Sequence, residues 1–254
     1  MVLDAFRLDG KVAWVTGASR GLGRAMAVAL AEAGADLVLS ARTVVDLEGT
    51  ASEVKRLGRQ ALAVQADVTR KADADAVVAR AIGEFDRIDI LVNNAGIAPV
   101  KTLVETEEAD WDAVINTNVR GPYLSTRAVG PHLIARKAGK VINMASVLSF
   151  VGEPMVVPYG TSKGAILQFT RGLAVEWARY NIQVNAICPG YFQTAMNEEF
   201  LASEEGRAYL NRWVPMRRAG RPAELGPAVV FLASAASDFI TGAHLVIDGG
   251  QLAR

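Results

Sequence analysis

The 254-residue sequence predicts a single α/β domain built on a doubly wound parallel sheet, with helices on both of its faces. Two observations predict this fold. Short β-branched runs alternate with longer helical patterns, and these runs are continuously apolar, which is typical of parallel strands buried on both faces. No linker, repeat or low-complexity segment interrupts the alternation. We therefore expect residues 1–254 to form one domain with about seven strands.

The expected strands are, in chain order, Val12–Thr16, Leu37–Ser40, Ala61–Gln65, Ile90–Asn93, Lys140–Met144, Gln183–Cys188 and His244–Ile247. The main helical patterns between them are Gly21–Ala33, Val44–Leu57, Ala72–Phe85, Glu108–Val129 and Tyr159–Tyr180. This order of strand, helix and strand is the one that a parallel sheet requires.

Two stretches depart from the alternation. The polar and aromatic segment 191–216 follows the sixth strand, and we expect it to act as a lid over a substrate. A last helix is expected near Pro222–Ala233, where Pro222 suits the first helical turn. Pro227 should either kink this helix or delay its start.

Charge and hydropathy exclude several classes of function. The chain has 27 basic and 27 acidic residues, without the cationic surface that nucleic acid binding needs. It has no apolar run of 18 residues, and the first ten residues carry Asp4, Arg7 and Asp9, unlike a signal peptide. We therefore expect a soluble cytoplasmic protein with no nucleic acid or membrane partner.

The few cysteine and histidine residues argue against a metal site. Cys188 is the single cysteine and cannot form an internal disulfide. Besides it the chain has only His132 and His244, which make no zinc-ligand cluster. We expect no bound metal.

A glycine-rich loop follows the first expected strand and leads into a helix. Glycines spaced GxxxGxG let the backbone turn sharply and approach a pyrophosphate, whose charge is favoured by a helix N-terminus. A tight turn alone is the other interpretation, but the flanking strand and helix favour a nucleotide. The sequence thus predicts a Rossmann-type dinucleotide site formed by Gly17, Ser19, Arg20, Gly21, Leu22 and Gly23.

The end of the second strand indicates which dinucleotide binds. An NAD-preferring site places a carboxylate there for the ribose 2′-hydroxyl, whereas this chain reads Ser40-Ala41-Arg42. Arg42 and Arg20 instead offer two guanidinium groups to a 2′-phosphate. Two solvated arginines are the alternative, and the missing acid favours NADP(H).

Tyr159 and Lys163 lie four residues apart in one predicted helix, on the same face. A phenol has an ordinary pKa near 10, and a fixed positive neighbour favours the phenolate. The pair is therefore suited to moving a proton, although many such pairs only share a solvated face.

Together with further motifs, the chain resembles a classical short-chain dehydrogenase/reductase over nearly its whole length. The motifs are Asn93-Asn94-Ala95-Gly96, Asn116-Thr117-Asn118, Ser146 at thirteen residues before Tyr159, and Pro189-Gly190. Ala145, where many members have a second serine, and Pro227 are small departures that do not touch the chemistry.

The resemblance implies an NADP(H)-dependent oxidoreductase that transfers a hydride between nicotinamide and a ketone or secondary alcohol. Tyr159 would be the proton donor and Ser146 a hydrogen-bond donor to the carbonyl oxygen, as this chemistry requires. Lys163 would hold the nicotinamide ribose and lower the pKa of Tyr159. Asn118 would position a water that relays protons to Lys163.

Further cofactor contacts follow from the same resemblance. Asp67 and Val68 would contact the adenine, and Asn94, Ala95 and Gly96 the central part of the cofactor. Thr194, beyond Pro189 and Gly190, would bind the nicotinamide carboxamide. Capping roles are the alternatives for Asp67 and Thr194.

The substrate remains open at this point. A mostly apolar lining favours a hydrophobic ketone, and it would comprise Ile97, Ala98, Pro99, Val147, Leu148, Phe150, Val151, Met155 and Val156. The segment 187–194 is similar to that of gluconate 5-dehydrogenases, which act on sugar acids. Arg136, Lys137 and Arg179 could instead dock an acidic carrier, as in 3-oxoacyl carrier-protein reductases.

Two other predictions concern activity and assembly. A silent NADP(H)-binding sensor is a rival function, which the intact set Asn118, Ser146, Tyr159 and Lys163 disfavours. Apolar residues cover much of the helices 108–129 and 159–180, and mean hydropathy is +0.20. With the family resemblance, this predicts a homotetramer.

Overall fold

The computed structural model describes residues 1–195 and 197–254, so Met196 of the expected lid lies outside the described residues. The predicted doubly wound parallel sheet is confirmed: seven strands lie in the order β3-β2-β1-β4-β5-β6-β7, and all pairings are parallel. The strands are β1 Val12–Thr16, β2 Asp36–Ala41, β3 Ala61–Gln65, β4 Ile90–Asn93, β5 Gly139–Met144, β6 Ile182–Pro189 and β7 His244–Ile247.

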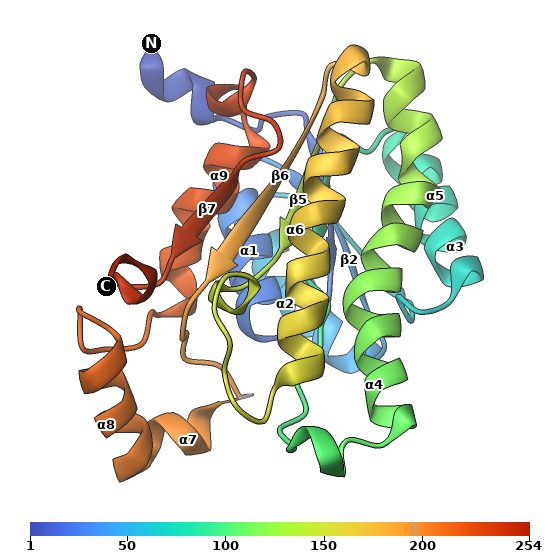
Figure 1. Cartoon of the computed structure of the whole chain (residues 1–254). Coiled ribbons are helices and arrows are strands. Elements are labelled where there is room, and N and C mark those ends of the chain that lie inside the picture. The colour runs from blue at the N-terminus through green and yellow to red at the C-terminus, as the bar shows by residue number, and fades with distance from the viewer. Residues whose placement is uncertain (196) are drawn as a thin grey trace.

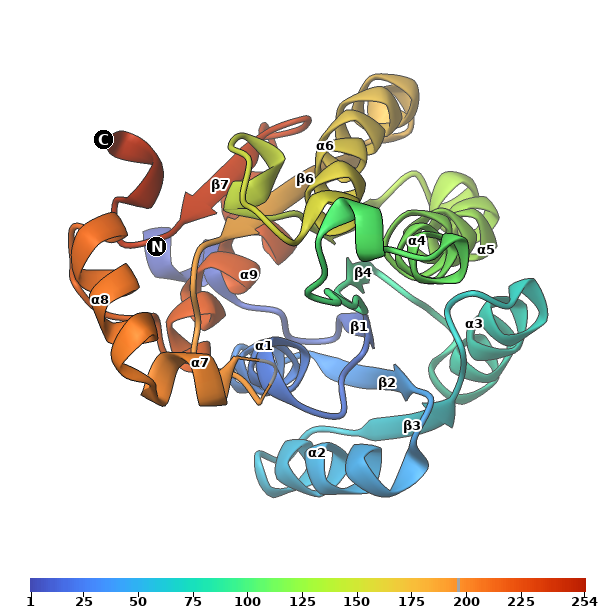
Figure 2. The same ribbon diagram turned by 60° about the horizontal axis from the view of Figure 1, so that its bottom comes forward.

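Helices cover both faces of this sheet (Figures 1 and 2). One face packs against α1 (Gly21–Glu32), α2 (Val44–Arg56) and α9 (Gly226–Ala233), with Leu30 and Leu39 fully buried between the layers. The other face packs against α3 (Lys71–Phe85), α5 (Gly121–Arg136) and α6 (Val157–Trp177). Burying one such leucine side chain stabilises the fold by about 1.5–3 kcal/mol.

The helix predicted over residues 108–129 is interrupted. The structure has α4 (Glu108–Ile115), then a π-helical turn (Asn116–Arg120), then α5, which continues to Arg136. At this turn the backbone N–H of Gly121 donates to the carbonyl of Asn116, five residues earlier. A π turn inside a helix is frequent at functional sites, because it re-aims one side chain without ending the helix.

Pro227 delays its helix and does not kink it. A 3-10 turn covers Pro222–Leu225, and α9 begins at Gly226 with Pro227 in its first turn. A proline at this point costs no helical hydrogen bond, because the first N–H groups of a helix have no partner within it.

Two short helices, α7 (Glu198–Ala202) and α8 (Glu204–Trp213), project beyond the carboxyl edge of the sheet (Figure 1). They belong to the segment expected to form a lid. Leu210 and Val214 of this segment pack in a small apolar cluster of their own with Ala219. The contacts of Leu210 and Val214 are therefore separate from the two main cores, whereas Phe192 of the same segment is buried in the core that contains Leu30 and Leu39.

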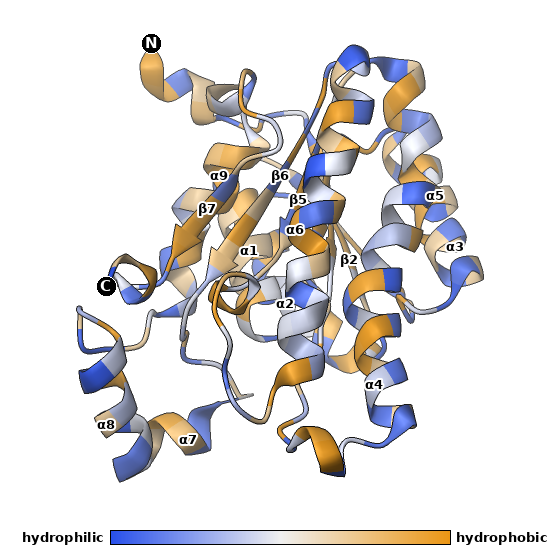
Figure 3. Ribbon diagram, in the orientation of Figure 1, coloured by the Kyte–Doolittle hydropathy of each residue, from blue (hydrophilic) through white to orange (hydrophobic). Residues whose placement is uncertain are grey.

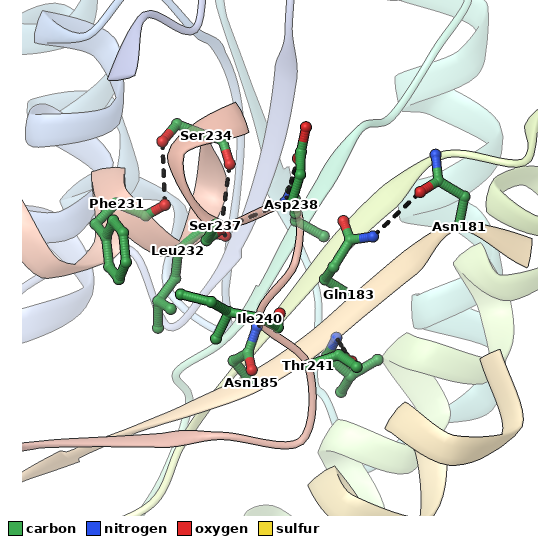
Figure 4. Close-up of polar contacts among 12 residues, drawn as sticks. Asn181, Gln183, Asn185, Phe231, Leu232, Ser234, Ser237, Asp238, Ile240 and Thr241 are labelled. Carbon is green, nitrogen blue, oxygen red and sulfur yellow. Dashed lines mark hydrogen bonds and ion pairs between the residues drawn. The ribbon is translucent and has the colours of Figure 1, made fainter. Parts of the chain in front are cut away.

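The loop between α9 and β7 is fastened to the amino half of β6 by polar side chains (Figure 4). Asn185 Nδ2 donates to the carbonyl of Ile240 at 2.7 Å, and its Oδ1 accepts from the N–H of Ala243 at 3.0 Å. The Thr241 hydroxyl accepts from Val184 N–H at 3.1 Å. These bonds fix the last strand in register beside β6.

None of the helices within residues 1–195 and 197–254 combines the length and the apolar character needed to span a bilayer. Along α4 and α6, hydrophobic and hydrophilic residues lie close together (Figure 3).

Candidate active site

A cavity of about 570 Å³ opens at the carboxyl edge of the sheet, beside the point where the strand order reverses between β1 and β4. Such a crevice is where open α/β sheets bind ligands. All the residues predicted for cofactor binding line it: Gly17, Ser19, Arg20, Gly21, Leu22, Gly23, Arg42, Asp67, Val68, Asn94, Ala95, Gly96, Tyr159, Lys163, Pro189, Gly190 and Thr194. Ser146 lines the same cavity.

The glycine loop needs its glycines for close packing. Gly17 has φ +65°, and a Cβ there would lie 2.9 Å from the Cα of Ala95. A Cβ on Gly23 would lie 2.2 Å from the carbonyl oxygen of Gly17. Asn94 Nδ2 donates to the carbonyls of Thr16 at 3.0 Å and Gly17 at 3.1 Å, so the two loops are held together. The N-terminus of α1 is thereby left open to the cavity.

Arg20 and Arg42 are both exposed and line one end of the cavity, as does Asp67. Burial opposes ionisation of Asp67, but hydrogen bonds from Thr69 and the charges of Arg42 and Arg70 lower its pKa overall. The positive charge of Arg42 therefore favours the ionised form of Asp67, and both side chains line the cavity.

Asp46 is a lining residue that the sequence reasoning missed. It lies in the first turn of α2, four residues beyond Arg42. The end of β2 has no acidic residue, but Asp46 places a carboxylate at the cavity from the helix that follows. The sequence could have indicated Asp46, because it lies at the start of the helix that follows the second strand and acidic residues are favoured in the first turn of a helix.

Lys163 lies one turn beyond Tyr159 on α6, as the spacing predicted. Its Nζ lies 5.4 Å from the centre of the Tyr159 ring and donates to the Met144 carbonyl at 2.6 Å. The side chain is buried, and this burial lowers the pKa of Lys163 to about 8.

The pKa expected for Tyr159 needs a correction. We expected Lys163 to lower it, whereas burial raises the pKa of Tyr159 above its usual value, and a hydrogen bond with Ser146 offsets part of that rise. The Lys163 ammonium is turned toward the Met144 carbonyl, so it does little to stabilise a phenolate. In this state of the protein the phenol keeps its proton.

Asn118 occupies the π turn and is almost fully buried. Its Oδ1 accepts from the Ile97 N–H at 2.9 Å, and its Nδ2 donates to the Ile97 carbonyl at 2.9 Å and to Ser162 Oγ at 3.0 Å. The side chain therefore joins the loop after β4 to α6. It does not line the cavity, although its neighbour Thr117 does.

Ser162 was also missed by sequence reasoning. Its hydroxyl accepts from Asn118 and donates to the Tyr159 carbonyl at 2.6 Å. Nothing in the spacing of the sequence pairs residues 118 and 162, which lie 44 positions apart. Other lining residues not predicted for the site are Ala41, Thr43, Ala66, Thr69, Met144, Ala145, Phe192, Ala195 and Asn197.

The residues expected to line a substrate pocket are only partly brought to the cavity. Ile97 lines it. Phe150 instead packs against His244 of β7, with ring centres 5.0 Å apart. Met155 is 45% exposed and adopts φ +64° in the loop before α6. Within the described residues, no cluster of histidine, cysteine and acidic side chains could hold a metal ion.

The chain is similar to known enzymes over its whole length. Residues 17–251 match the family described as "Enoyl-(Acyl carrier protein) reductase". The chain is 44% identical over 255 residues to a 2-dehydro-3-deoxy-D-gluconate 5-dehydrogenase of Escherichia coli, with both chains covered completely. It is 42% identical to the 5-keto-D-gluconate 5-reductase of the same organism over 249 residues, 98% of each chain.

A solved structure shares the fold closely. The gluconate 5-dehydrogenase of Burkholderia cenocepacia, in complex with NADP and tartrate, is 40% identical and superposes with a TM-score of 0.96 over 100% of both chains. Identity of this extent over complete chains, together with the site geometry, establishes the family. The chain belongs to the short-chain dehydrogenase/reductase family and is an oxidoreductase that acts on alcohol and carbonyl groups.

Proposed function

We propose that the protein reduces a keto-sugar acid with NADPH, or oxidises the corresponding hydroxy acid with NADP⁺, in the cavity at the carboxyl edge of the sheet. The observation that carries the proposal is that Ser146, Tyr159 and Lys163 line the same cavity as the glycine loop. The sugar acid substrates named for the relatives supply the substrate class.

The residues present fit NADP(H). The cradle at Gly17 and Gly23 leaves no room for a side chain, which suits a backbone that must approach a pyrophosphate. Arg20 and Arg42, exposed at one end of the cavity, would hold the 2′-phosphate. Asp67 and Val68 would border the adenine, and Thr194 the carboxamide.

In the mechanism that we propose, bound NADPH supplies the hydride to the carbonyl carbon. Tyr159 gives its phenolic proton to the carbonyl oxygen, and Ser146 donates a hydrogen bond to the same oxygen. The raised pKa of Tyr159 keeps that proton in place before reaction, which suits reduction. For the reverse reaction Lys163 must stabilise the phenolate.

Asn118 and the segment 191–216 have supporting roles in this proposal. By holding Ile97 and Ser162, Asn118 fixes the π turn beside α6, where a water could relay a proton to Lys163. The segment 191–216 would close over the substrate, because it contributes Phe192, Thr194 and the separate α7–α8 pair. We also propose a cytoplasmic location, where the free thiol of Cys188 stays reduced.

A hydrophobic ketone is the second candidate substrate, which the exposed apolar side chains of Phe150, Val151 and Met155, in the segment between Ser146 and Tyr159, favour. Both candidates are tested by incubating the protein with NADPH and a panel of 5-keto-D-gluconate, aliphatic ketones and β-keto thioesters, while nicotinamide absorbance is followed. Preferred turnover of 5-keto-D-gluconate supports the proposal. Turnover of the other two classes alone would contradict the sugar-acid substrate, and no turnover at all would favour a silent sensor.

Lys163 should make NADPH binding depend on pH. Its pKa is about 8 in the free protein, and an anionic cofactor beside the ammonium raises that pKa on binding. Below pH 8 the lysine is already charged and affinity should be constant, whereas above pH 8 affinity should fall by up to about tenfold per pH unit. Fluorescence titrations on both sides of this pH check the prediction. Lys163→Met should bind NADPH more weakly, and its affinity should no longer change slope near pH 8. If the change of slope persists in this variant, another group causes it.

We propose a homotetramer in solution. Val175 on α6 is 83% exposed, and Trp111 on α4 and Tyr123 on α5 are 36% and 47% exposed. These apolar side chains lie on three helices, and burying them against another copy would remove them from water. Light scattering at micromolar concentration should give four times the 27.0 kDa chain mass. The mass of a single chain would refute this assembly.

A further inference from the structure

Three polar side chains, Tyr191, Tyr209 and Glu153, form a row that joins the segment 191–216 to the loop before α6. Tyr191 directly follows Gly190, which lines the cavity together with Tyr159. The Tyr191 and Tyr209 ring centres lie 5.0 Å apart. Tyr209 Oη donates to Glu153 Oε2 at 2.7 Å. The row therefore ends in a carboxylate.

Glu153 lies in the loop between Ser146 and Tyr159, and Tyr209 lies on α8. Their hydrogen bond joins residues 56 positions apart and so ties the loop before α6 to α8. Burial and the bond to Glu153 both raise the pKa of Tyr209, so its hydroxyl stays protonated and keeps donating. Tyr209 thus fixes one carboxylate oxygen in place.

The carboxylate of Glu153 has capacity left for a ligand. An ionised carboxylate accepts about four hydrogen bonds, and Tyr209 supplies one of them. Among the described residues, the salt bridges do not include Glu153. Its negative charge therefore has no cationic partner there, and the side chain is half-buried.

We propose that Glu153, held by Tyr209, determines substrate specificity by accepting hydrogen bonds from the neutral hydroxyl end of the substrate and repelling an anionic group from that end. This inference rests on the proposed function and deepens it. A hydroxyl group can donate to the carboxylate, and such a bond to a charged acceptor is stronger than one between neutral groups. A second carboxylate at the same position would meet like charge in a partly desolvated site.

The orientation of the substrate follows from this charge. A keto-sugar acid would lie with its hydroxyl-bearing end toward Glu153 and its own carboxylate away from it. A keto-aldaric acid of the same length, which has carboxylates at both ends, cannot avoid Glu153. The wild-type protein should therefore discriminate between the two substrates.

The test compares 5-keto-D-gluconate, the keto-aldaric acid of the same length and cyclohexanone with wild type and Glu153→Gln. Glutamine keeps an oxygen acceptor for Tyr209 but removes the charge. We expect kcat/KM for 5-keto-D-gluconate to fall about tenfold, mainly through KM, because a charge-assisted hydrogen bond is lost. The ratio of kcat/KM for the keto-aldaric acid over 5-keto-D-gluconate should rise at least about tenfold, with cyclohexanone unchanged.

Arg254→Ala is the matched control. Arg254 stacks on Trp213 of α8 at 3.9 Å, so this variant loosens the same helix without altering the Glu153 carboxylate. Its effect should be similar for all three substrates. Tyr209→Phe should reproduce the change in substrate ratio in weaker form, because Glu153 loses its support. NADPH binding, measured by fluorescence, shows that each variant is folded.

Three results would overturn the inference. If the ratio of kcat/KM for the keto-aldaric acid over 5-keto-D-gluconate is unchanged in Glu153→Gln, the charge of Glu153 does not determine specificity. The same change of ratio in Arg254→Ala would mean that Glu153 acts only by holding α8. A wild-type protein that reduces cyclohexanone but neither sugar-derived acid would refute the proposed substrate class and this inference with it, whereas the first two results leave the proposed function intact.

Discussion

Tyr159→Phe should lower the turnover number by about 10² or more while NADP(H) affinity stays nearly the same. The substitution removes the phenolic oxygen and leaves the ring, whose packing and distance to Lys163 are otherwise retained. The proposed proton donor to the carbonyl oxygen is then lost, whereas the glycine loop and the two arginines that we propose to contact the cofactor are untouched. Steady-state kinetics with the best substrate of the panel and fluorescence titration with NADPH measure the two quantities.

The control for this prediction is Tyr180→Phe, at the end of the 3-10 turn that follows α6 and outside the cavity lining. It should keep wild-type turnover. Lys163→Ala should differ from both variants, because it damages cofactor affinity and rate together. If Tyr159→Phe keeps near wild-type turnover, Tyr159 is not the proton donor and the proposed mechanism fails.

The second large effect concerns the choice of dinucleotide. The wild-type protein should prefer NADPH over NADH by on the order of 10²-fold in kcat/KM, because two charge-assisted hydrogen bonds to the 2′-phosphate remain worth several kcal/mol after discounting for exposure. Arg20 and Arg42 both line the cavity. Exposed charges are screened by salt, so the preference should weaken as ionic strength rises.

The combined substitution Ala41→Asp and Arg42→Ser should reverse this preference. A carboxylate at the end of β2 repels the phosphate and accepts a hydrogen bond from the free ribose hydroxyl. Asp46 also lines the cavity, so the phosphate would lose one of its two arginines and face two acids. Arg56→Ser, an exposed arginine on α2 that is not a lining residue, serves as control. A wild-type preference for NADH would show that the two arginines are surface residues.

The sequence alone determined the architecture and the residues that line most of the proposed cofactor cavity, for a physical reason that is local. Apolar runs the length of a strand identify the sheet, and the spacing of Gly17, Gly21 and Gly23 between a strand and a helix predicts a phosphate-binding turn. The four-residue separation of Tyr159 and Lys163 places them on one face of a helix in any fold. Parallel strands bring their carboxyl ends to one edge of the sheet, so the glycine loop and the Tyr159–Lys163 pair line the same cavity.

Only the tertiary structure decided the contacts between distant segments and the electrostatics that they create. The π turn at Asn118 depends on Ile97 and Ser162, whose positions no local pattern relates to it. The raised pKa of Tyr159 is mainly a matter of burial, which spacing along a helix does not reveal. The bond between Glu153 and Tyr209 likewise forms because the loop before α6 and helix α8 meet in the folded chain. Desolvation and such pairings belong to the assembled fold, since they depend on which surfaces meet rather than on neighbours in the chain.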